Sequence, residues 1–113
     1  MAENETETVL LTGASGLKYE FEVFDPEDSV PPVGGVFVVS GRDAERTNGP
    51  GDAVWLVGRA ANLSRTLSLV KRHARVLRTA RPWRYCVRVE RDDRAARSRI
   101  AKDLAARYRP MSG

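Results

Sequence analysis

The chain has 113 residues and a formal net charge of +4, and this length suits one domain that can bury a sizeable core. Cys86 is the only cysteine and His73 the only histidine, which excludes an internal disulfide and a Cys/His zinc cluster. The sequence has no apolar run of membrane-spanning length, and its N-terminus is acidic. We therefore expect a cytoplasmic protein without a signal peptide or a membrane partner.

Charge is divided unevenly between the two halves of the chain. Residues 1–58 carry 3 basic and 11 acidic side chains, whereas residues 59–113 carry 16 basic and 4 acidic ones. This division predicts an electropositive surface made by the C-terminal half. The anionic partners that fit it are nucleic acid, another protein, or the acidic half of a second copy.

The N-terminal region reads as an acidic tail followed by a β-hairpin. Residues 1–7 are acidic and polar, and we expect them to be disordered ahead of a single domain at residues 8–113. Within residues 8–24, two strand-like runs flank the turn Gly13-Ala14-Ser15-Gly16. The second run alternates apolar and charged residues, which predicts one dry face and one wet face. The turn lacks the GK[ST] motif of phosphate-binding loops, so we do not interpret it as one.

Two further strands are predicted after a proline-rich acidic linker at residues 25–32. Residues 35–40 form a run of β-branched and apolar side chains that is typical of a central strand. Residues 53–57 are five consecutive apolar residues, and we expect a strand buried on both faces. A polar, glycine-rich loop at residues 41–52 joins these two strands.

A basic amphipathic helix is predicted next. Asn62 or Ser64 serves as its N-cap, and Pro82 ends it. At 100° per residue, its apolar side chains form one stripe and its basic side chains an adjoining one. No Asp or Glu lies within residues 53–89, whereas a merely solvated helix face usually mixes both signs. This helix is therefore a candidate binding surface.

The chain closes with a strand and a second helix. Residues 83–90 alternate apolar side chains with Arg84, Cys86, Arg88 and Glu90, which predicts a strand with one basic face. The neighbouring arginines would favour a thiolate at Cys86, but we expect a buried structural cysteine there. Asp92 or Asp93 caps the last helix, and Pro110 ends it. The predicted order is hairpin, β, β, α, β, α, which is an α+β fold.

Four short motifs have the spacing of a known superfamily. They are Gly35-Val36-Phe37, Leu56-Val57-Gly58, Asn62-Leu63 at the helix start and Tyr108-Arg109-Pro110 at the end of the last helix. Together with the leading hairpin, they resemble small stand-alone bacterial members of the GIY-YIG endonuclease-like superfamily. The resemblance implies a GIY-YIG-like ββαβα core at residues 35–110, preceded by an N-terminal β-hairpin.

The resemblance also implies where phosphodiester hydrolysis would take place. Domains of this superfamily surround the phosphate with two tyrosines, an arginine and a metal-binding glutamate. The two tyrosine positions correspond to Phe37 and Leu56. The arginine position corresponds to Thr66, and the glutamate position to Ala101. None of these side chains supplies the required chemistry, so we expect a degenerate active site with no catalytic residue and no metal ligand.

We therefore expect a domain that binds nucleic acid, either DNA or RNA, through an arginine-rich face without cleaving it. Neutralising about four phosphates would give a log–log salt slope of roughly −3 to −4 on duplex DNA. The candidate contacts lie at the mouth of the former active site, just after the strand at residues 53–57, on the first helix, and on the strand that follows it. They are Arg59, Arg65, Lys71, Arg72, Arg75, Arg78, Arg84 and Arg88.

Two alternatives remain open on the sequence. The first is a protein-interaction or assembly subunit, in which the acidic and basic halves meet partners of opposite charge or each other. The second is an endonuclease with relocated residues that uses Arg65, His73 and either Asp103 or Glu90. Only the nuclease would need a cofactor, a divalent metal such as Mg²⁺.

Overall fold

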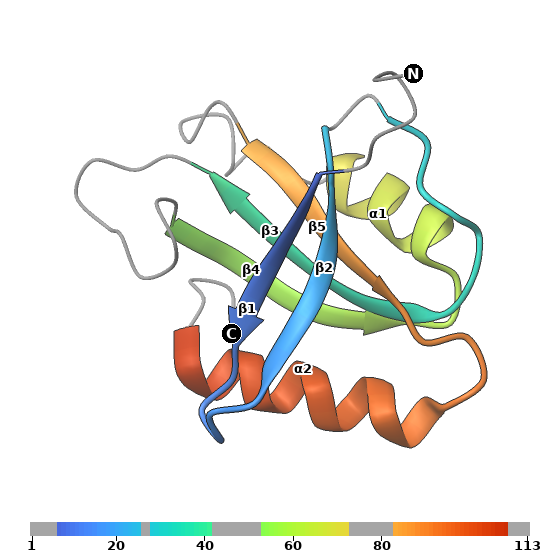
Figure 1. The fold of residues 1–113 in the computed structure, drawn as a ribbon. Coiled ribbons are helices and arrows are strands. Elements are labelled where there is room, and N and C mark those ends of the chain that lie inside the picture. The colour runs from blue at the N-terminus through green and yellow to red at the C-terminus, as the bar shows by residue number, and fades with distance from the viewer. Residues whose placement is uncertain (1–6, 26–27, 42–52, 73–82, 109–113) are drawn as a thin grey trace.

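The computed structural model describes residues 7–25, 28–41, 53–72 and 83–108 (Figure 1). In chain order, the elements are β1 (Thr8–Thr12), β2 (Lys18–Phe24), β3 (Gly35–Gly41), β4 (Ala53–Ala60), α1 (Leu63–Arg72), β5 (Trp83–Val89) and α2 (Arg94–Tyr108). This order matches the predicted one, and the α+β class is confirmed. The predicted N-terminal tail up to residue 6 and the predicted helix ends at Pro82 and Pro110 lie outside the described residues.

The five strands form one antiparallel sheet in the order β1-β2-β5-β3-β4. β1 and β2 form the predicted hairpin, and β3 and β4 form a second antiparallel pair. β5 lies between the two pairs, next to β2 on one side and β3 on the other (Figure 1). The last strand in the sequence therefore joins two separate strand pairs into one sheet.

The two helices pack on opposite faces of the sheet, so the fold has three layers. Alternate residues of a strand point to opposite faces, and β3 and β5 therefore supply side chains to both cores. The α1 core consists of Val30, Phe37, Val39, Ala60, Leu63, Leu67, Tyr85 and Val87. The α2 core consists of Leu11, Tyr19, Phe21, Val36, Val38, Cys86, Ile100, Ala101, Leu104 and Tyr108. We refer to the two sides of the sheet as the α1 face and the α2 face.

Both helices begin with a side-chain cap of the predicted kind. The Asn62 Oδ1 accepts a hydrogen bond from the Arg65 backbone nitrogen at 3.1 Å, so Asn62 and not Ser64 caps α1. The Asp93 Oδ1 accepts one from the Ala96 backbone nitrogen at 2.8 Å and caps α2. Each cap satisfies one of the backbone donors that a helix start leaves without an intrahelical partner.

The strand predictions hold for β3 and β5 but are wrong in one respect for β4. β3 is paired on both sides, and its residues from Val36 to Val39 are buried, as expected of a central strand. Cys86 on β5 is buried in the α2 core, as predicted. β4, expected to be buried on both faces, is an edge strand on which Leu56 and Val57 are only partly buried. Its apolar run arises because Leu56 packs against the α1 core and Val57 against the α2 core.

Neither of the two described helices is long and apolar enough to cross a lipid bilayer.

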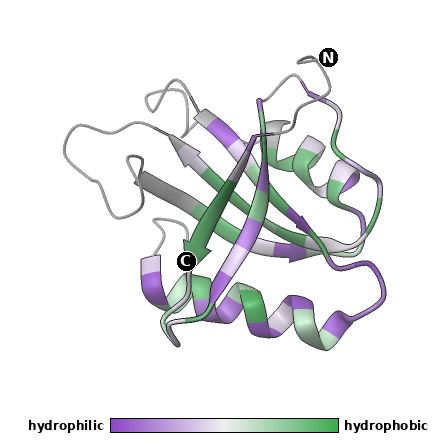
Figure 2. Ribbon diagram, viewed as in Figure 1, coloured by the Kyte–Doolittle hydropathy of each residue, from purple (hydrophilic) through white to green (hydrophobic). Residues whose placement is uncertain are grey.

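Figure 2 shows hydrophobic and hydrophilic residues alternating around α2. The buried residues of this helix, from Ala96 to Tyr108, recur at helical spacing on one side of it.

Two leucines of α1 allow a matched test of the packing. The Leu63 side chain is fully buried in the α1 core, whereas the Leu69 side chain is 48% exposed. Leu63→Ala should lower the free energy of unfolding by about 2–5 kcal/mol, because it leaves a cavity in the core. Leu69→Ala makes the same chemical change on the same helix and should cost less than about 1 kcal/mol. Urea denaturation measures both, and equal losses would contradict this packing of α1.

Candidate functional site

The structure divides the predicted contact residues between the two sides of the sheet. Arg59 on β4 and Arg88 on β5 both lie opposite Val36 of β3, whose side chain is in the α2 core. They therefore lie on the α2 face, and Arg84 shares that face because it is four residues before Arg88 on the same strand. Arg65 is exposed on α1, which packs on the other face.

The remaining predicted contacts belong to the end of α1 and the segment after it. The side chains of Lys71 and Arg72, and the whole of Arg75 and Arg78, lie outside the described residues. Among the residues described, the predicted arginine-rich face is thus two separate surfaces, one on each side of the sheet.

Arg84 and Arg88 make contacts within the fold. The Arg88 Nε donates to a Glu90 carboxylate oxygen at 3.0 Å, and its Nη1 donates to the Glu20 backbone carbonyl at 3.3 Å. The Arg84 Nη1 lies 3.5 Å from a carboxylate oxygen of Glu7. These two carboxylates offset much of the positive charge expected on this face of β5.

The four positions of the degenerate active site do not meet in one place. Phe37 lies in the α1 core, Leu56 packs against that core, and Thr66 is on α1. Ala101 lies in the α2 core, across the sheet from the other three. The Phe37 ring lies directly against Gly58, since a Cβ on this glycine would come within 2.5 Å of Phe37 Cζ.

Asp103, the carboxylate nearest to the expected metal-binding position, is bound by the hairpin turn. Its Oδ1 accepts a hydrogen bond from the Ser15 backbone nitrogen at 2.8 Å. Its Oδ2 accepts from the Ser15 hydroxyl at 2.6 Å and from the Tyr19 hydroxyl at 2.8 Å. Its backbone carbonyl accepts from the Ala14 nitrogen at 3.0 Å, and Gly13 leaves room for the carboxylate because a Cβ there would overlap it. The turn therefore holds an anion, which is the chain's own Asp103.

The pKa of Asp103 is lowered and the pKa of Tyr19 is raised, so the carboxylate stays charged and the phenol stays neutral. The Ser15 hydroxyl first, and then the Tyr19 hydroxyl, lower the pKa of Asp103 below its usual value. Burial raises the pKa of Tyr19, and the hydrogen bond to Asp103 raises it further. At neutral pH, Asp103 is therefore the acceptor and Tyr19 the donor.

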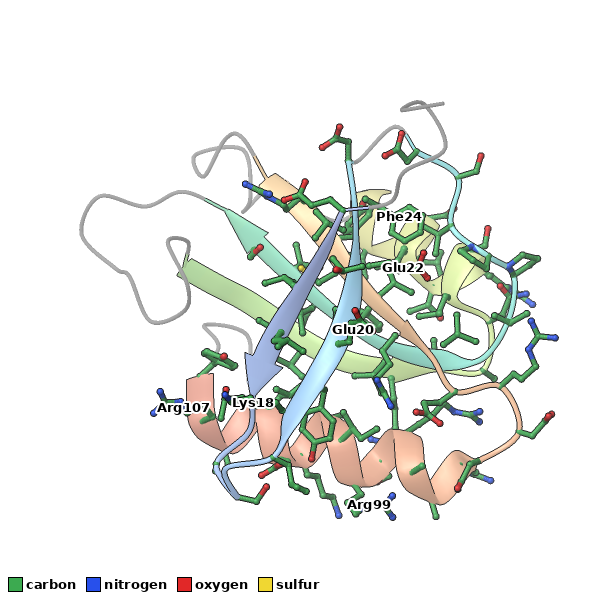
Figure 3. The ribbon with its side chains drawn as sticks, viewed as in Figure 1. Lys18, Glu20, Glu22, Phe24, Arg99 and Arg107 are labelled. Atoms are coloured by element: carbon green, nitrogen blue, oxygen red, sulfur yellow. The ribbon has the colours of Figure 1, made fainter. Side chains whose placement is uncertain are left out.

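A cationic surface on α2 was not among the predicted contacts. Asp103 is the single carboxylate of this helix, and its oxygens are hydrogen-bonded to the hairpin rather than to a cation of α2. The exposed cations of α2 and the loop before it are Arg91, Arg94, Arg99, Lys102 and Arg107, which we call the α2 cations. Within the described part of the chain, none of them forms a salt bridge with a carboxylate. Figure 3 shows Arg99 pointing away from the sheet and Arg107 near the C-terminal end of the helix.

The composition of residues 94–108 could have predicted this cationic surface. Residues 94–108 contain four arginines and one lysine against a single acidic residue. Arg97, the remaining arginine, donates from Nη1 to the Glu90 carbonyl at 2.8 Å and the Arg91 carbonyl at 3.2 Å, so it fastens the loop before the helix. The sequence alone did not show that Asp103 would be hydrogen-bonded to the hairpin.

The residues proposed for a relocated nuclease site are also separated. Arg65 is on the α1 side of the sheet and Asp103 on the α2 side, while Glu90 is bound by Arg88. His73 lies outside the described residues. Among residues that the structure does describe, no group of three or more His, Cys, Asp or Glu side chains is placed to hold a metal ion.

Comparison of the chain with protein-family models, with curated proteins and with solved structures found no match.

The link between Asp103 and the hairpin predicts a specific pH dependence. A lowered carboxyl pKa stabilises the fold above the unfolded-state pKa, and this contribution is lost as pH falls through the folded-state pKa. Asp103→Ala should therefore lower the unfolding free energy at pH 7, and the difference from wild type should shrink below about pH 4. Urea denaturation at both pH values measures this.

Asp92→Ala is the matched control, because Asp92 is exposed and makes no hydrogen bond or salt bridge among the described residues. It should change stability little at either pH. If the Asp103 and Asp92 variants showed the same pH profile, the carboxylate would not be what holds the hairpin to α2.

Proposed function

We propose that this chain binds nucleic acid through the α2 cations and does not cleave it. The observation that carries the proposal is the excess of positive charge on α2 and the loop before it, where five exposed cations form no salt bridge with a carboxylate among the described residues. Phosphate groups are the ligands that arginine and lysine clusters of this kind bind most generally.

The length of α2 suits contact with several phosphates. The helix has 15 residues, which is roughly 21 Å at 1.5 Å per residue. Duplex DNA carries one negative charge about every 1.7 Å of its axis. Cations at both ends and in the middle of the helix can therefore contact phosphates together, and Arg59, exposed on the same side of the sheet, can add to them. Arg65, exposed on α1, lies on the other side of the sheet and would not share this surface.

The absence of cleavage is part of the proposal. It is supported by the residues at the positions that the GIY-YIG resemblance marks, because Phe37 and Leu56 have no hydroxyl and Ala101 has no carboxylate. It is also supported by Asp103, whose carboxylate oxygens are taken by Ser15 and Tyr19. The finer description of the fold, a GIY-YIG-like core with a degenerate site, belongs to the proposal and is supported by the ββαβα order of β3 to α2.

Neutralising the centre of the α2 surface should weaken binding and its dependence on salt. We expect the wild-type protein to bind labelled oligonucleotides with a log–log salt slope of roughly −3 to −4 on duplex DNA. The double variant Arg99→Gln/Lys102→Gln should lower affinity at least about tenfold at low salt and reduce the slope by about 2. Fluorescence anisotropy across a salt series, on DNA and RNA probes, measures both quantities.

The matched control is Arg65→Gln/Lys71→Gln, which removes the same charge from α1. It should affect binding less than the α2 variant, and the reverse ranking would place the interface on α1. Incubation of the probe with Mg²⁺ should leave it intact on a gel. Absence of any salt-sensitive binding would overturn the proposal, and Mg²⁺-dependent cleavage would favour the nuclease alternative.

A further inference from the structure

The β1–β2 hairpin has one face that no helix covers. Tyr19 and Phe21 point into the α2 core, so Lys18, Glu20 and Glu22 point to the opposite side, where they follow one another along β2 (Figure 3). On that side of the sheet α1 packs over β3 and β4, and of the hairpin the Phe24 end of β2 packs against the α1 core. We call this surface the open hairpin face.

The open hairpin face combines apolar groups with the carboxylates of Glu20 and Glu22, and Lys18 lies at its turn end. Leu10, directly opposite Glu20 in the β1–β2 register, is 58% exposed. Beside it the surface is hollowed where β2 separates from β5, and Thr8, Glu20, Glu22, Val87, Arg88 and Val89 line this hollow. Within the described part of the chain, neither the Glu20 nor the Glu22 carboxylate forms a hydrogen bond or a salt bridge. A partner for this face needs cations together with small or aliphatic groups.

We propose that the occupant of this face is the outer side of α2 from a second copy of the chain. That side carries Arg99 and Lys102, one helical turn apart, next to the small exposed residues Ala95 and Ala106. The small residues let the helix approach Leu10, and the two cations meet the two carboxylates. This inference uses the same Arg99 and Lys102 as the proposed nucleic-acid surface, but it does not depend on nucleic-acid binding, since it rests on the match between those cations and the carboxylates of the open hairpin face.

The spacing of the charged groups on the two surfaces agrees. Glu20 and Glu22 are two residues apart on one face of a strand, which corresponds to about 7 Å. Arg99 and Lys102 are at helix positions i and i+3, whose Cβ atoms are about 5–6 Å apart. Long cationic side chains can bridge the difference of one or two ångströms.

The two surfaces also have a definite relative orientation within one copy. The open hairpin face points away from the α2 face of the sheet, whereas the outer side of α2 points away from the sheet on that other side. The contact therefore joins two different patches that face in opposite directions. Such a heterologous contact repeats from copy to copy without closing into a two-fold dimer.

Sedimentation velocity of the full chain tests this assembly. In low salt, at about 25–50 mM, the weight-average mass should rise roughly twofold or more over a tenfold increase in protein concentration, and return to the monomer value near 0.5 M salt. The variant Glu20→Gln/Glu22→Gln should lose this rise and still bind oligonucleotides. The control Asp25→Asn/Asp92→Asn changes the net charge equally at two exposed carboxylates away from the face and should keep the rise.

Charge reversal gives the decisive comparison. The variants Glu20→Lys/Glu22→Lys and Arg99→Glu/Lys102→Glu should each stay monomeric alone, because their two surfaces then have the same sign. Mixed in equal amounts, they should associate, because each surface meets an opposite one on the other variant. The circular dichroism spectrum of each variant should match that of the wild type, which checks that the variant is folded. A wild-type monomer at all low-salt concentrations, or a mixture that stays monomeric, would overturn the proposal.

Discussion

The pairing of β5 with two strand pairs at once is the constraint on which the rest of this structure depends. On one side β5 pairs with β2 along Tyr85 to Val87, and on the other it pairs with β3 along its whole length. Its alternation places Tyr85 and Val87 in the α1 core and Cys86 in the α2 core. Without this strand the N-terminal hairpin would have no neighbour in the sheet, and each helix would lose part of the surface it packs on.

The sheet also turns a charge division along the chain into a division in space. The acids of β2 are on the open hairpin face, while the α2 cations are on the outermost surface of the other side. The one carboxylate of α2 itself, Asp103, is hydrogen-bonded to Ser15 and Tyr19 of the hairpin. The three hydrogen bonds that Ser15 and Tyr19 donate to this carboxylate therefore hold the hairpin on α2.

Features that depend on neighbours in the chain could be predicted from the sequence, and features that depend on distant partners could not. The caps Asn62 and Asp93 and the alternation in β2 are local signals, and the structure contains all of them. The edge position of β4 was not predictable, because an apolar run looks the same whether or not a further strand pairs beside it. The hydrogen bond between Ser15 and Asp103 joins residues 88 positions apart in the chain, so no local sequence pattern predicts it.

Arg88 shows how a residue chosen for its charge can have another task. β2 and β5 stop pairing beyond Glu22 and Val87, and the Arg88 guanidinium binds the Glu20 carbonyl that this separation leaves open to it. The Arg88 guanidinium carbon also lies 6.0 Å from the centroid of the Tyr19 ring, which belongs to β2. In an alanine scan of the basic residues, loss of binding at this position would report a displaced hairpin rather than a lost ligand contact.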